Sequence, residues 1–465
     1  MIDTHKLKRR DLYLSKMLAF QDTEPVKVVT GIRRCGKSSL LKLMVSHLKE
    51  NGIADEQIVE INFESHAFKN MNSDTFYEYV KEKVVADKRM YLFFDEVQRV
   101  PSWEDAINSF RVDFNCDIYV TGSNAYMLSS EYDTYLSGRC VEIKMLPLSF
   151  REFLYFHDFE IKESQSALGG TRKQAVDKNG EHYELRELFD AYMRFGGMPG
   201  IADVGLDQEK AMMLLEGIYS TVIMRDILER ENRRGQKKIT DAVLLKKIVL
   251  FLADNIGSSI SVSSIGNTLV NEGLLEDGKR KGTPSAHTVQ AYVNALLEAY
   301  FFYDIKRFDI KGKEYLRTLG KYYIVDIGMR NYLLGFRGRD SGHALENIVY
   351  FELLRRGYAV SIGKVDNIFC AMPTSIMREV APDYAPCLTF MCTLPQRSSH
   401  LILNISGKSV MCLASGTSRN RAGACVRKFF LQRMCTIRKP LNKACPRRKW
   451  RCCLIIFLPV YMVLH

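Results

Sequence analysis

The stretch that decides the fold is residues 26–50, VKVVTGIRRCGKSSLLKLMVSHLKE. Its first five residues are apolar or β-branched apart from Lys27, which predicts a buried strand. Apolar residues recur at helical spacing over residues 37–49, which predicts a helix. Between them, residues 31–38 match the pattern G-x-x-x-x-G-K-[ST] at every required position. The alternative is a chance glycine-rich surface turn, and the flanking strand and helix argue against it.

Each residue type in this loop suits the binding of phosphate. Gly31 and Gly36 permit backbone conformations that turn amide N–H groups around an anion, and the helix N-terminus adds partial positive charge. Lys37 is expected to neutralise β- and γ-phosphate oxygens, and the Ser38 hydroxyl to ligate Mg²⁺. The expected nucleotide-binding residues are therefore Gly31, Ile32, Arg33, Arg34, Cys35, Gly36, Lys37 and Ser38.

Two further strand ends carry polar side chains. The apolar segment 90–94 is followed by Asp95 and Glu96. Asp95 is expected to hold Mg²⁺ through its bound water, and Glu96 to polarise the attacking water, because open α/β sheets place their chemistry at strand carboxyl ends. Segment 117–121 leads to Ser123 and Asn124, either of which could hydrogen-bond the γ-phosphate. The alternative in both places is an ordinary polar loop.

A positive charge outside the loop is also expected. Arg139, in the segment LSGRC, is a candidate arginine finger in cis or in trans, and the alternative is a solvated surface arginine. No Asn-Lys-x-Asp segment follows a later strand, so adenine is favoured over guanine as the base. The sequence therefore favours ATP as the nucleotide, with Mg²⁺.

The order of elements over residues 1–160 indicates an α/β domain. Strand candidates at 26–30, 57–63, 90–94 and 117–121 alternate with helical patterns at 37–49, 73–85 and 103–110. Strands separated by helices of this length predict a parallel sheet with helices on both faces, as in P-loop NTPases. A polar stretch at 169–180 is expected to be a surface loop, and residues 181–235 a helical linker region.

Residues 236–335 have a different pattern. Three helical stretches, at 244–260, 261–270 and 285–305, precede strand-like segments around 301–309 and 315–319. That order predicts a mainly α region containing a winged helix-turn-helix, which makes DNA a possible partner. The third helix has no Lys or Arg, which counts against DNA binding. Residues 336–367, a helix followed by a strand, are expected to begin a truncated α/β part.

The C-terminal segment 368–465 departs from the rest of the chain. From Cys370 onward there are 15 Lys and Arg but two acids, so this segment accounts for the formal charge of +12. It also holds nine of the twelve cysteines, without a C-x-x-C pair. This composition favours out-of-frame translation after about residue 367 over a genuine basic extension, and we expect disorder there.

The composition also bears on location. Three scattered cysteines before residue 370 fit a reducing, cytoplasmic compartment. The apolar run at 452–464 is about half the roughly 20 residues that a spanning helix needs, and Pro459 interrupts it. No membrane partner is therefore expected. An oligomer is possible, since Arg139 acting in trans would require one.

Several motifs together resemble a known family. GIRRCGKSSL, YLFFDEVQ, YVTGSNA and LSGR…LPLSFREF resemble the prokaryotic AAA-type ATPases, and GGMPG, TVIMRDILER and KYYIVDIGMRN resemble their C-terminal domain of unknown function. The resemblance covers roughly residues 7–367. It implies ATP binding by residues 31–39, which adds Ser39, Mg²⁺ at Ser38 and Asp95, and a sensor at Asn124. It also implies a restriction-endonuclease-like C-terminal part.

In such a nuclease-like part, Glu346 would be the first acidic residue of the site. Strands bearing an Asp and a Glu-x-Lys pair should follow Gly363, where this chain departs into the cysteine-rich segment. A nuclease-type site is therefore expected to be incomplete. Two hypotheses follow from the sequence: Mg²⁺-dependent ATP hydrolysis by residues 1–160, and alternatively a nucleotide-gated DNA-binding module with slow hydrolysis.

Overall fold

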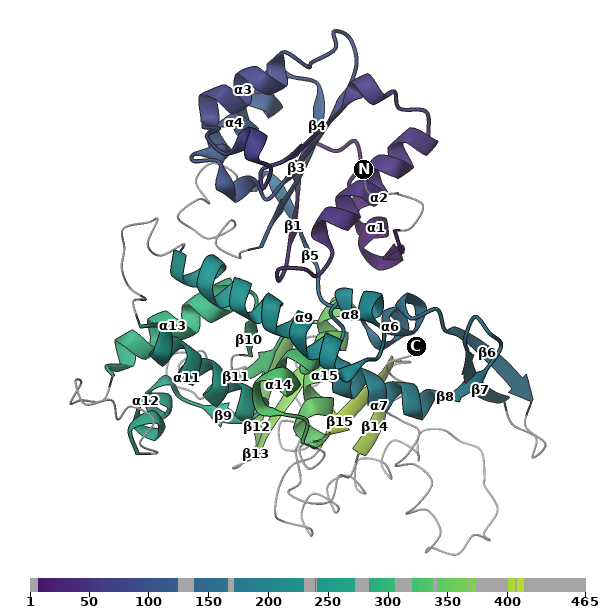
Figure 1. The fold of residues 1–465 in the computed structure, drawn as a ribbon, viewed down its shortest axis with the longest axis vertical. Coiled ribbons are helices and arrows are strands. Elements are labelled where there is room, and N and C mark those ends of the chain that lie inside the picture. Colours follow the sequence, from purple (N-terminus) through teal and green to yellow (C-terminus); the bar gives the residue numbers. More distant parts are fainter. Residues whose placement is uncertain are drawn as a thin grey trace, which may run out of the picture.

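The structure is a computed structural model of the full chain. The structure describes residues 7–123, 138–165, 171–229, 239, 241–271, 284–305, 320–337, 341–365, 368–373, 400–405 and 408–413. The described chain forms an upper lobe built on a parallel sheet and a lower, mostly helical lobe (Figure 1). Within the described residues, no helix is both long enough and apolar enough to cross a membrane.

The upper lobe contains a five-stranded sheet. Its strands are β1 (Val26–Thr30), β2 (Ile58–Asn62), β3 (Met90–Asp95), β4 (Cys116–Gly122) and β5 (Cys140–Lys144). They lie in the order β2-β3-β4-β1-β5, and every neighbouring pair is parallel. The expected α/β class is confirmed, and the four predicted strands agree with the structure to within two residues. The edge strand β5 was not predicted.

Helices cover both faces of this sheet (Figure 1). On one side lie α1 (Asp11–Leu18) and α2 (Lys37–Glu50), and on the other α3 (Ser73–Lys81) and α4 (Trp103–Asp113). Side chains alternate along the fully buried strand β3. Tyr91 and Phe93 join the core under α2, whereas Leu92 and Phe94 join the core under α3 and α4. This strand is apolar throughout because each of its faces is covered.

The upper lobe also contains short 3-10 turns, and after β5 the chain continues into the lower lobe. The 3-10 turns are η2 (Asp55–Gln57), η3 (His66–Phe68) and η4 (Val97–Arg99). After β5 the chain passes through residues 145–149, the connecting segment, into α6 (Phe150–Phe156). Strands β6 (Glu160–Gln165), β7 (Thr171–Val176) and β8 (His182–Glu184) then form an antiparallel sheet. The predicted surface loop at 169–180 is therefore wrong for β7, in which four polar residues precede the buried Ala175 and Val176.

The helical linker region is close to the prediction. It comprises α7 (Leu185–Phe195), α8 (Gly200–Val204) and α9 (Gln208–Ser220), followed without a break by a π-helix, η6 (Thr221–Glu229). The core under α1 and α2 continues into these helices, because Met44 and Leu215 belong to the same buried cluster. The two lobes therefore share one hydrophobic core.

Next come three helices and a small sheet. The helices α11 (Ala242–Asp254), α12 (Val262–Asn271) and α13 (Ala286–Glu298) lie within or beside the predicted segments. Strands β9 (Ser259–Ile260), β10 (Phe302–Ile305) and β11 (Gly320–Ile324) form an antiparallel sheet in the order β10-β11-β9. The strand predicted at 315–319 lies outside the described residues, and β11 begins at the next residue.

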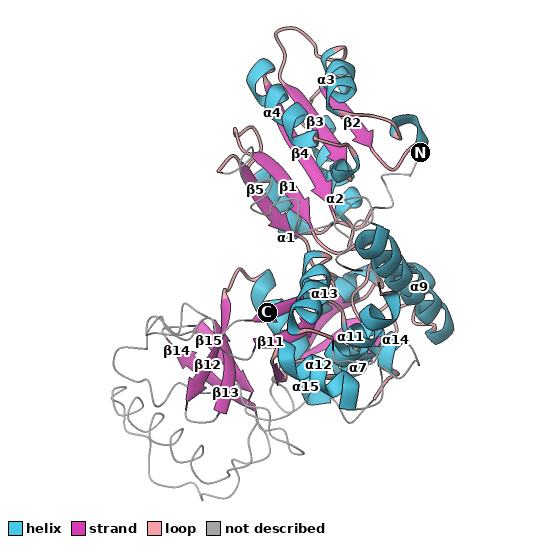
Figure 2. Cartoon of the chain, turned by 90° about the vertical axis from the view of Figure 1, so that its left-hand side faces the viewer, coloured by secondary structure: helices cyan, strands magenta, loops and turns pink. Residues whose placement is uncertain are grey.

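The last described elements are α14 (Ile327–Leu334), α15 (Ser341–Arg355) and two antiparallel hairpins. The hairpins are β12 (Val360–Val365) with β13 (Ile368–Pro373), and β14 (His400–Ile405) with β15 (Lys408–Leu413). They lie close together beside the helices (Figure 2). Within the segment where disorder is expected, the described residues pair as β13, β14 and β15; the rest of residues 368–465 lies outside the described residues, and the expectation stays a prediction there.

Candidate nucleotide-binding site

The loop between β1 and α2 has the backbone shape that phosphate binding requires. Gly31 and Gly36 adopt φ angles of +143° and +101°, which L-residues rarely tolerate. A Cβ atom on Gly31 would also lie 2.2 Å from the carbonyl oxygen of Met145. That residue's N–H donates to Thr30 at 2.7 Å, so the loop is packed directly against the connecting segment. Glycine is therefore required at position 31 by sterics as well as by φ.

Lys37 begins α2 and points back into the loop. Its side chain is almost fully buried, and its ammonium group donates to the carbonyl oxygens of Gly31 at 3.0 Å and Ile32 at 3.2 Å. Ser38 is exposed at the start of α2, and its side chain lies close enough to Asp95 to lower the pKa of that carboxyl. The loop lysine, the loop serine and the acid at the end of β3 therefore occupy one site.

Asp95 is buried at the carboxyl end of β3. Its carboxylate accepts hydrogen bonds from Thr121 Oγ1 and, at 2.9 Å, from Asn62 Nδ2. Burial raises the pKa of Asp95, and the Thr121 hydrogen bond and the nearby Ser38 hydroxyl oppose that increase. A hydroxyl and a carboxylate close together are a donor set that suits Mg²⁺, so these residues fit the expected ion.

Glu96 has an unusual backbone conformation. Its φ of +56° and ψ of +44° place it in the left-handed region, where a glutamate is strained. The conformation is held by its N–H, which donates to Thr121 Oγ1 at 2.9 Å. Its side chain is buried and accepts hydrogen bonds from Gln98 and, at 3.4 Å, from Ser123 Oγ. Strain of this kind is characteristic of functional sites.

Thr121 is a site residue that the sequence did not single out. Its hydroxyl donates to Asp95 and accepts from the Glu96 N–H, so one side chain on β4 positions both acids of β3. A threonine at the end of a strand carries no signal in a single sequence. The parallel pairing of β3 with β4 brings these residues together.

The two remaining predicted catalytic residues have different outcomes. Asn124 lies outside the described residues, although Ser123 beside it contacts Glu96. Arg139 is exposed, donates to Asn108 at 3.2 Å, and immediately precedes β5. Its carbonyl oxygen accepts from the N–H of Val26, at the amino end of β1 and about 13 Å of strand away from the loop. This placement argues against the role of Arg139 in cis, and the role in trans stays a prediction.

The other loop residues differ in burial. Ile32 and Cys35 are fully buried, and burial raises the pKa of the Cys35 thiol. Arg34 is exposed, with a φ of +64°. Arg33 is mostly buried and pairs with Glu64 at 2.6 Å and with Asp226 of η6 at 3.3 Å. Ser39 is half-buried and lines a cavity.

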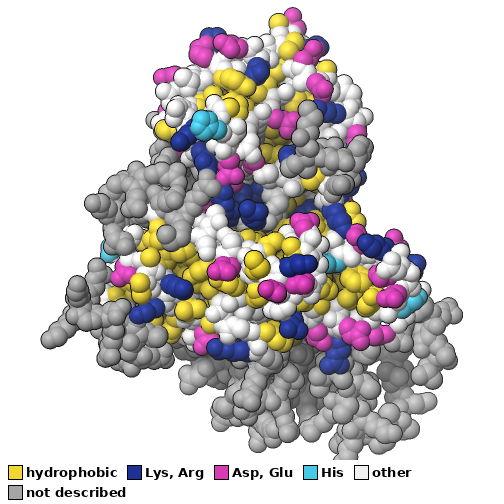
Figure 3. Space-filling model, viewed as in Figure 1, with side chains coloured by type: hydrophobic (Ala, Val, Ile, Leu, Met, Phe, Trp, Pro, Cys, Tyr) yellow, Lys and Arg dark blue, Asp and Glu magenta, His cyan; other side chains and the backbone are white. Residues whose placement is uncertain are grey.

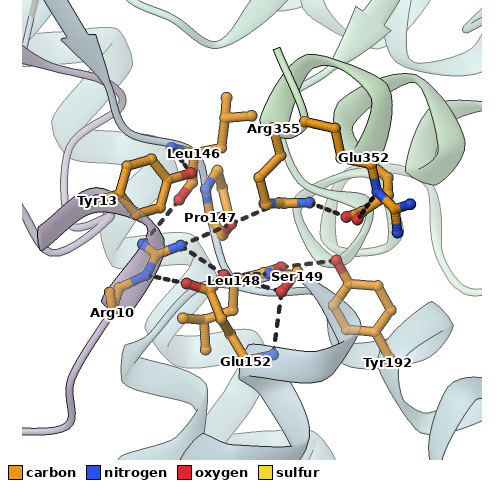
Figure 4. Close-up of polar contacts among 11 residues, drawn as sticks. Arg10, Tyr13, Leu146, Pro147, Leu148, Ser149, Glu152, Tyr192, Glu352 and Arg355 are labelled. Carbon is orange, nitrogen blue, oxygen red and sulfur yellow. Dashed lines mark hydrogen bonds and ion pairs between the residues drawn. The ribbon is translucent and has the colours of Figure 1, made fainter. Parts of the chain in front are cut away.

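Arg10 supports the loop from behind. Its guanidinium donates to the carbonyl oxygens of Cys35 at 3.0 Å, Leu146 at 2.9 Å and Pro147 at 3.3 Å. It also forms a bidentate ion pair with Glu152 of α6 (Figure 4). The sequence did not identify Arg10, because nothing in KLKRRD distinguishes this buried arginine from its exposed neighbours.

The connecting segment is held by the C-terminal helices as well. Arg355, at the end of α15, donates to Pro147 at 3.0 Å, and the Tyr192 hydroxyl donates to Leu148 at 2.8 Å (Figure 4). The Leu148 N–H in turn donates to Gly197 at 2.6 Å. The loop and the lower lobe are therefore linked by a continuous set of hydrogen bonds through four consecutive backbone positions.

A cavity of about 370 Å³ adjoins the loop. It lies between the N-terminal segment, the start of α2 and the α6–α8 region, and its lining includes Leu7, Gly36, Ser39, Leu43, Phe156 and Pro199. The charged residues Lys8, Arg10, Asp158 and Asp203 line it as well, and its position next to Gly36 and Ser39 suits a ring attached to a phosphate chain. Cavities of this size are typical of small-molecule sites.

Glu346, the candidate nuclease acid, is fully buried. It accepts hydrogen bonds from Lys321 Nζ at 2.8 Å and from the Tyr323 hydroxyl at 2.6 Å. Among the described residues, no group of three or more His, Cys, Asp or Glu side chains is arranged to hold a metal ion. In this chain Glu346 therefore joins α15 to β11.

Comparisons with known proteins agree with this geometry. The model of a family described as "AAA domain" matches residues 23–154, and that of a family described as "Domain of unknown function" matches residues 186–340. An uncharacterized protein of Haemophilus influenzae is 40% identical over 360 residues, which is 77% of this chain and 81% of that protein. The uncharacterized protein MJ1544 of Methanocaldococcus jannaschii is 31% identical over 72% of this chain and 67% of its own.

Among solved structures, the Walker-type ATPase PABY2304 of Pyrococcus abyssi is similar over 70% of this chain and 95% of that one. Its TM-score is 0.43 and its sequence identity is 16%.

The fold, the loop and the family models define the class: this chain carries an AAA-family P-loop ATPase domain. Within that class it belongs to the family that includes the Haemophilus influenzae protein. In this chain the AAA domain precedes the domain of unknown function. The resemblance noted from the sequence is therefore confirmed.

Proposed function

We propose that the protein binds ATP at residues 31–39 and hydrolyses it to ADP and phosphate in the presence of Mg²⁺. The observation that carries this proposal is the arrangement of the loop and the acids of β3. Ser38 and the buried Lys37 lie near Asp95, and Glu96 follows in a strained conformation fixed by Thr121. A site that only bound phosphate would not need the second acid or its strain.

Each residue has a role that its position supports. Lys37 exchanges its two carbonyl partners for phosphate oxygens and neutralises their charge. Ser38 and Asp95 hold Mg²⁺, which supplies further charge neutralisation when it is bound. Glu96 accepts a hydrogen bond from the attacking water, orients it and takes up its proton. We propose that Asn124, which follows Ser123 in the sequence, hydrogen-bonds the γ-phosphate.

The adenine ring is proposed to lie in the cavity beside Gly36 and Ser39. Leu7, Leu43 and Phe156 supply apolar surface for the ring. Because Pro199 of the lower lobe lines the same cavity, the nucleotide would contact both lobes. Hydrolysis and release of the nucleotide would change these contacts between the two lobes. We propose that ATP drives motion of the C-terminal region in this way.

The test compares binding with turnover. Glu96→Gln should retain ATP affinity within about threefold while turnover falls at least about a hundredfold. Glu60→Gln is the matched control, because Glu60 is an exposed acid on the neighbouring strand β2. Turnover by Glu96→Gln at the rate of the control would remove Glu96 from the mechanism.

A second candidate function is DNA binding by residues 241–324. The observation that favours it is the succession of α11, β9, α12, α13, β10 and β11 with its small antiparallel sheet, the order expected of a winged helix. Gln290 and Asn294 lie exposed on α13, where they could reach base edges. If this region binds DNA, the chain should shift the electrophoretic mobility of duplex DNA in a salt-dependent manner. That shift should weaken when Gln290 and Asn294 are both replaced with alanine. Unchanged binding would point instead to the basic C-terminal segment.

A further inference from the structure

A polar contact joins the nucleotide loop to the π-helix of the lower lobe. Arg33, the third residue of the loop, donates from Nη1 to Asp226 at 3.3 Å and from Nη2 to Glu64 at 2.6 Å. Glu64 follows β2 and also pairs with Arg99 at 3.1 Å. The space-filling view shows Lys and Arg side chains gathered with acidic ones where the two lobes meet (Figure 3). The loop arginine is thus held between an acid of each lobe.

The position of Asp226 is fixed by its helix. Val222, Ile223 and Ile227 on η6 are buried in the shared core. Because these apolar residues hold η6 in place, Asp226 cannot move together with the Arg33 side chain unless the packing of that core changes. The π-helical winding itself is rare and is frequently found at functional sites. The acid is therefore presented to the loop by a packed and unusual element.

Arg33 lies close to the acids of the site, because its partner Glu64 comes two residues after the end of β2, which pairs with the end of β3. Burial alone would lower the pKa of Arg33, but the charges of Asp226 and Glu64 outweigh it, and Glu96 adds to their effect. Arg33 and Glu96 are therefore within electrostatic range of one another. A guanidinium group has five N–H donors, and the contacts to Asp226 and Glu64 use two of them. Donors remain for phosphate oxygens.

We propose that Asp226 is a positioning residue for ATP hydrolysis: it holds the guanidinium of Arg33 toward the γ-phosphate end of the loop. Because Asp226 belongs to the lower lobe, turnover then depends on how that lobe is seated against the loop. This inference rests on the proposed function and deepens it. Arg33 supplies in cis the positive charge that Arg139 is too distant to supply.

Charge removal at constant shape tests the proposal. Asp226→Asn in the full chain should lower kcat by about tenfold while KM changes by less than about twofold, because the contact positions a transition-state charge. Asp226→Glu keeps the charge and should recover most of the rate. Glu216→Gln is the control, since Glu216 is an exposed acid on the preceding helix α9. The thermal midpoint of each variant is measured alongside.

A double-mutant cycle then identifies the route. If Asp226 acts through Arg33, the double variant Asp226→Asn, Arg33→Gln should be no slower than Arg33→Gln alone. Losses that multiply, or a kcat of Asp226→Asn equal to that of Glu216→Gln, would overturn the inference. The two proposals fail in different ways. If the wild-type chain does not hydrolyse ATP, the proposed function is wrong. If the wild-type chain hydrolyses ATP and Asp226→Asn has the same kcat, only the inference about Asp226 is wrong.

Discussion

Replacing Arg10 with methionine should be among the most damaging single changes outside the phosphate-contacting residues. Arg10 is 3% exposed, and its guanidinium contacts Cys35. It also contacts Leu146, Pro147 and Glu152 (Figure 4). Methionine keeps an unbranched apolar stem but removes every one of these hydrogen bonds. The variant therefore isolates the polar contribution of the side chain.

The structure sets the size of the effect. Breaking a buried ion pair by removing one partner costs about 3–5 kcal/mol. Glu152 retains the N–H and hydroxyl of Ser149, and Pro147 retains Arg355, which limits the loss. The carbonyl oxygens of Cys35 and Leu146 each lose a donor, at about 1 kcal/mol apiece. We expect a total of about 4–5 kcal/mol, because the retained partners offset part of the pair's cost.

The assay is urea denaturation followed by circular dichroism, with Arg9→Met as the matched control. Arg9 is the neighbouring residue, and its pair with Asp11 is exposed to solvent. The double variant Arg10→Met, Glu152→Gln should recover part of the loss, since the buried carboxylate is then neutral. If Arg10→Met lies within about 1 kcal/mol of Arg9→Met, the stabilising role of this contact set is wrong.

The same variant has a pH signature. Burial raises the pKa of Glu152, but the Arg10 charge outweighs it and the net pKa is lowered. A carboxyl with a depressed folded-state pKa stabilises the fold above its unfolded value of 4.5, and this contribution is lost as the pH falls below that value. Arg10→Met should therefore lose less stability than the wild type on acidification. An equal loss in both would contradict the assignment.

Two further predictions concern stability. Burial raises the pKa of Glu104 to about 7, so this carboxyl costs stability as the pH rises from 4.5 through 7. Glu104→Gln should exceed the wild type by about 2–3 kcal/mol at pH 8 and match it near pH 4, as thermal melts at both pH values would show. Gly197→Ala should lower stability by at least about 2 kcal/mol, because its Cβ would lie 2.3 Å from the Leu148 carbonyl oxygen. If the melting temperature of Gly197→Ala equals that of the wild type, the prediction is wrong, because the connecting segment then accommodates the added methyl group without loss of stability.

The sequence predicts the nucleotide loop well because its signals are local. The glycine positions, Lys37 and Ser38 lie within eight residues, and the strand and helix that flank them have strong periodicity. The acids at the end of β3 are predictable for the same reason. In the structure Ser38 lies near enough to Asp95 to lower the pKa of that carboxyl, and the roles of both residues stay predictions.

What the sequence could not predict depends on contacts between distant segments. Pairing of β5 with β1 places Arg139 at the far end of the sheet from the loop, and no local pattern reports that pairing. Thr121, Arg10 and Asp226 act through partners 25 to 193 residues away along the chain. An isolated sequence carries no record of such neighbours. The strand β7 is missed because its first four residues are polar and do not alternate with apolar ones.

The central claim is that the loop binds the phosphates of ATP through its backbone N–H groups and the ammonium group of Lys37. Calorimetric titration of ATP with Mg²⁺ into the Lys37→Ala chain tests it most directly. Lys49→Ala is the control, because Lys49 is an exposed lysine at the far end of the same helix. The account predicts that Lys37→Ala weakens ATP binding by about a hundredfold, whereas the control binds like the wild type. Equal affinity in the two variants would contradict it.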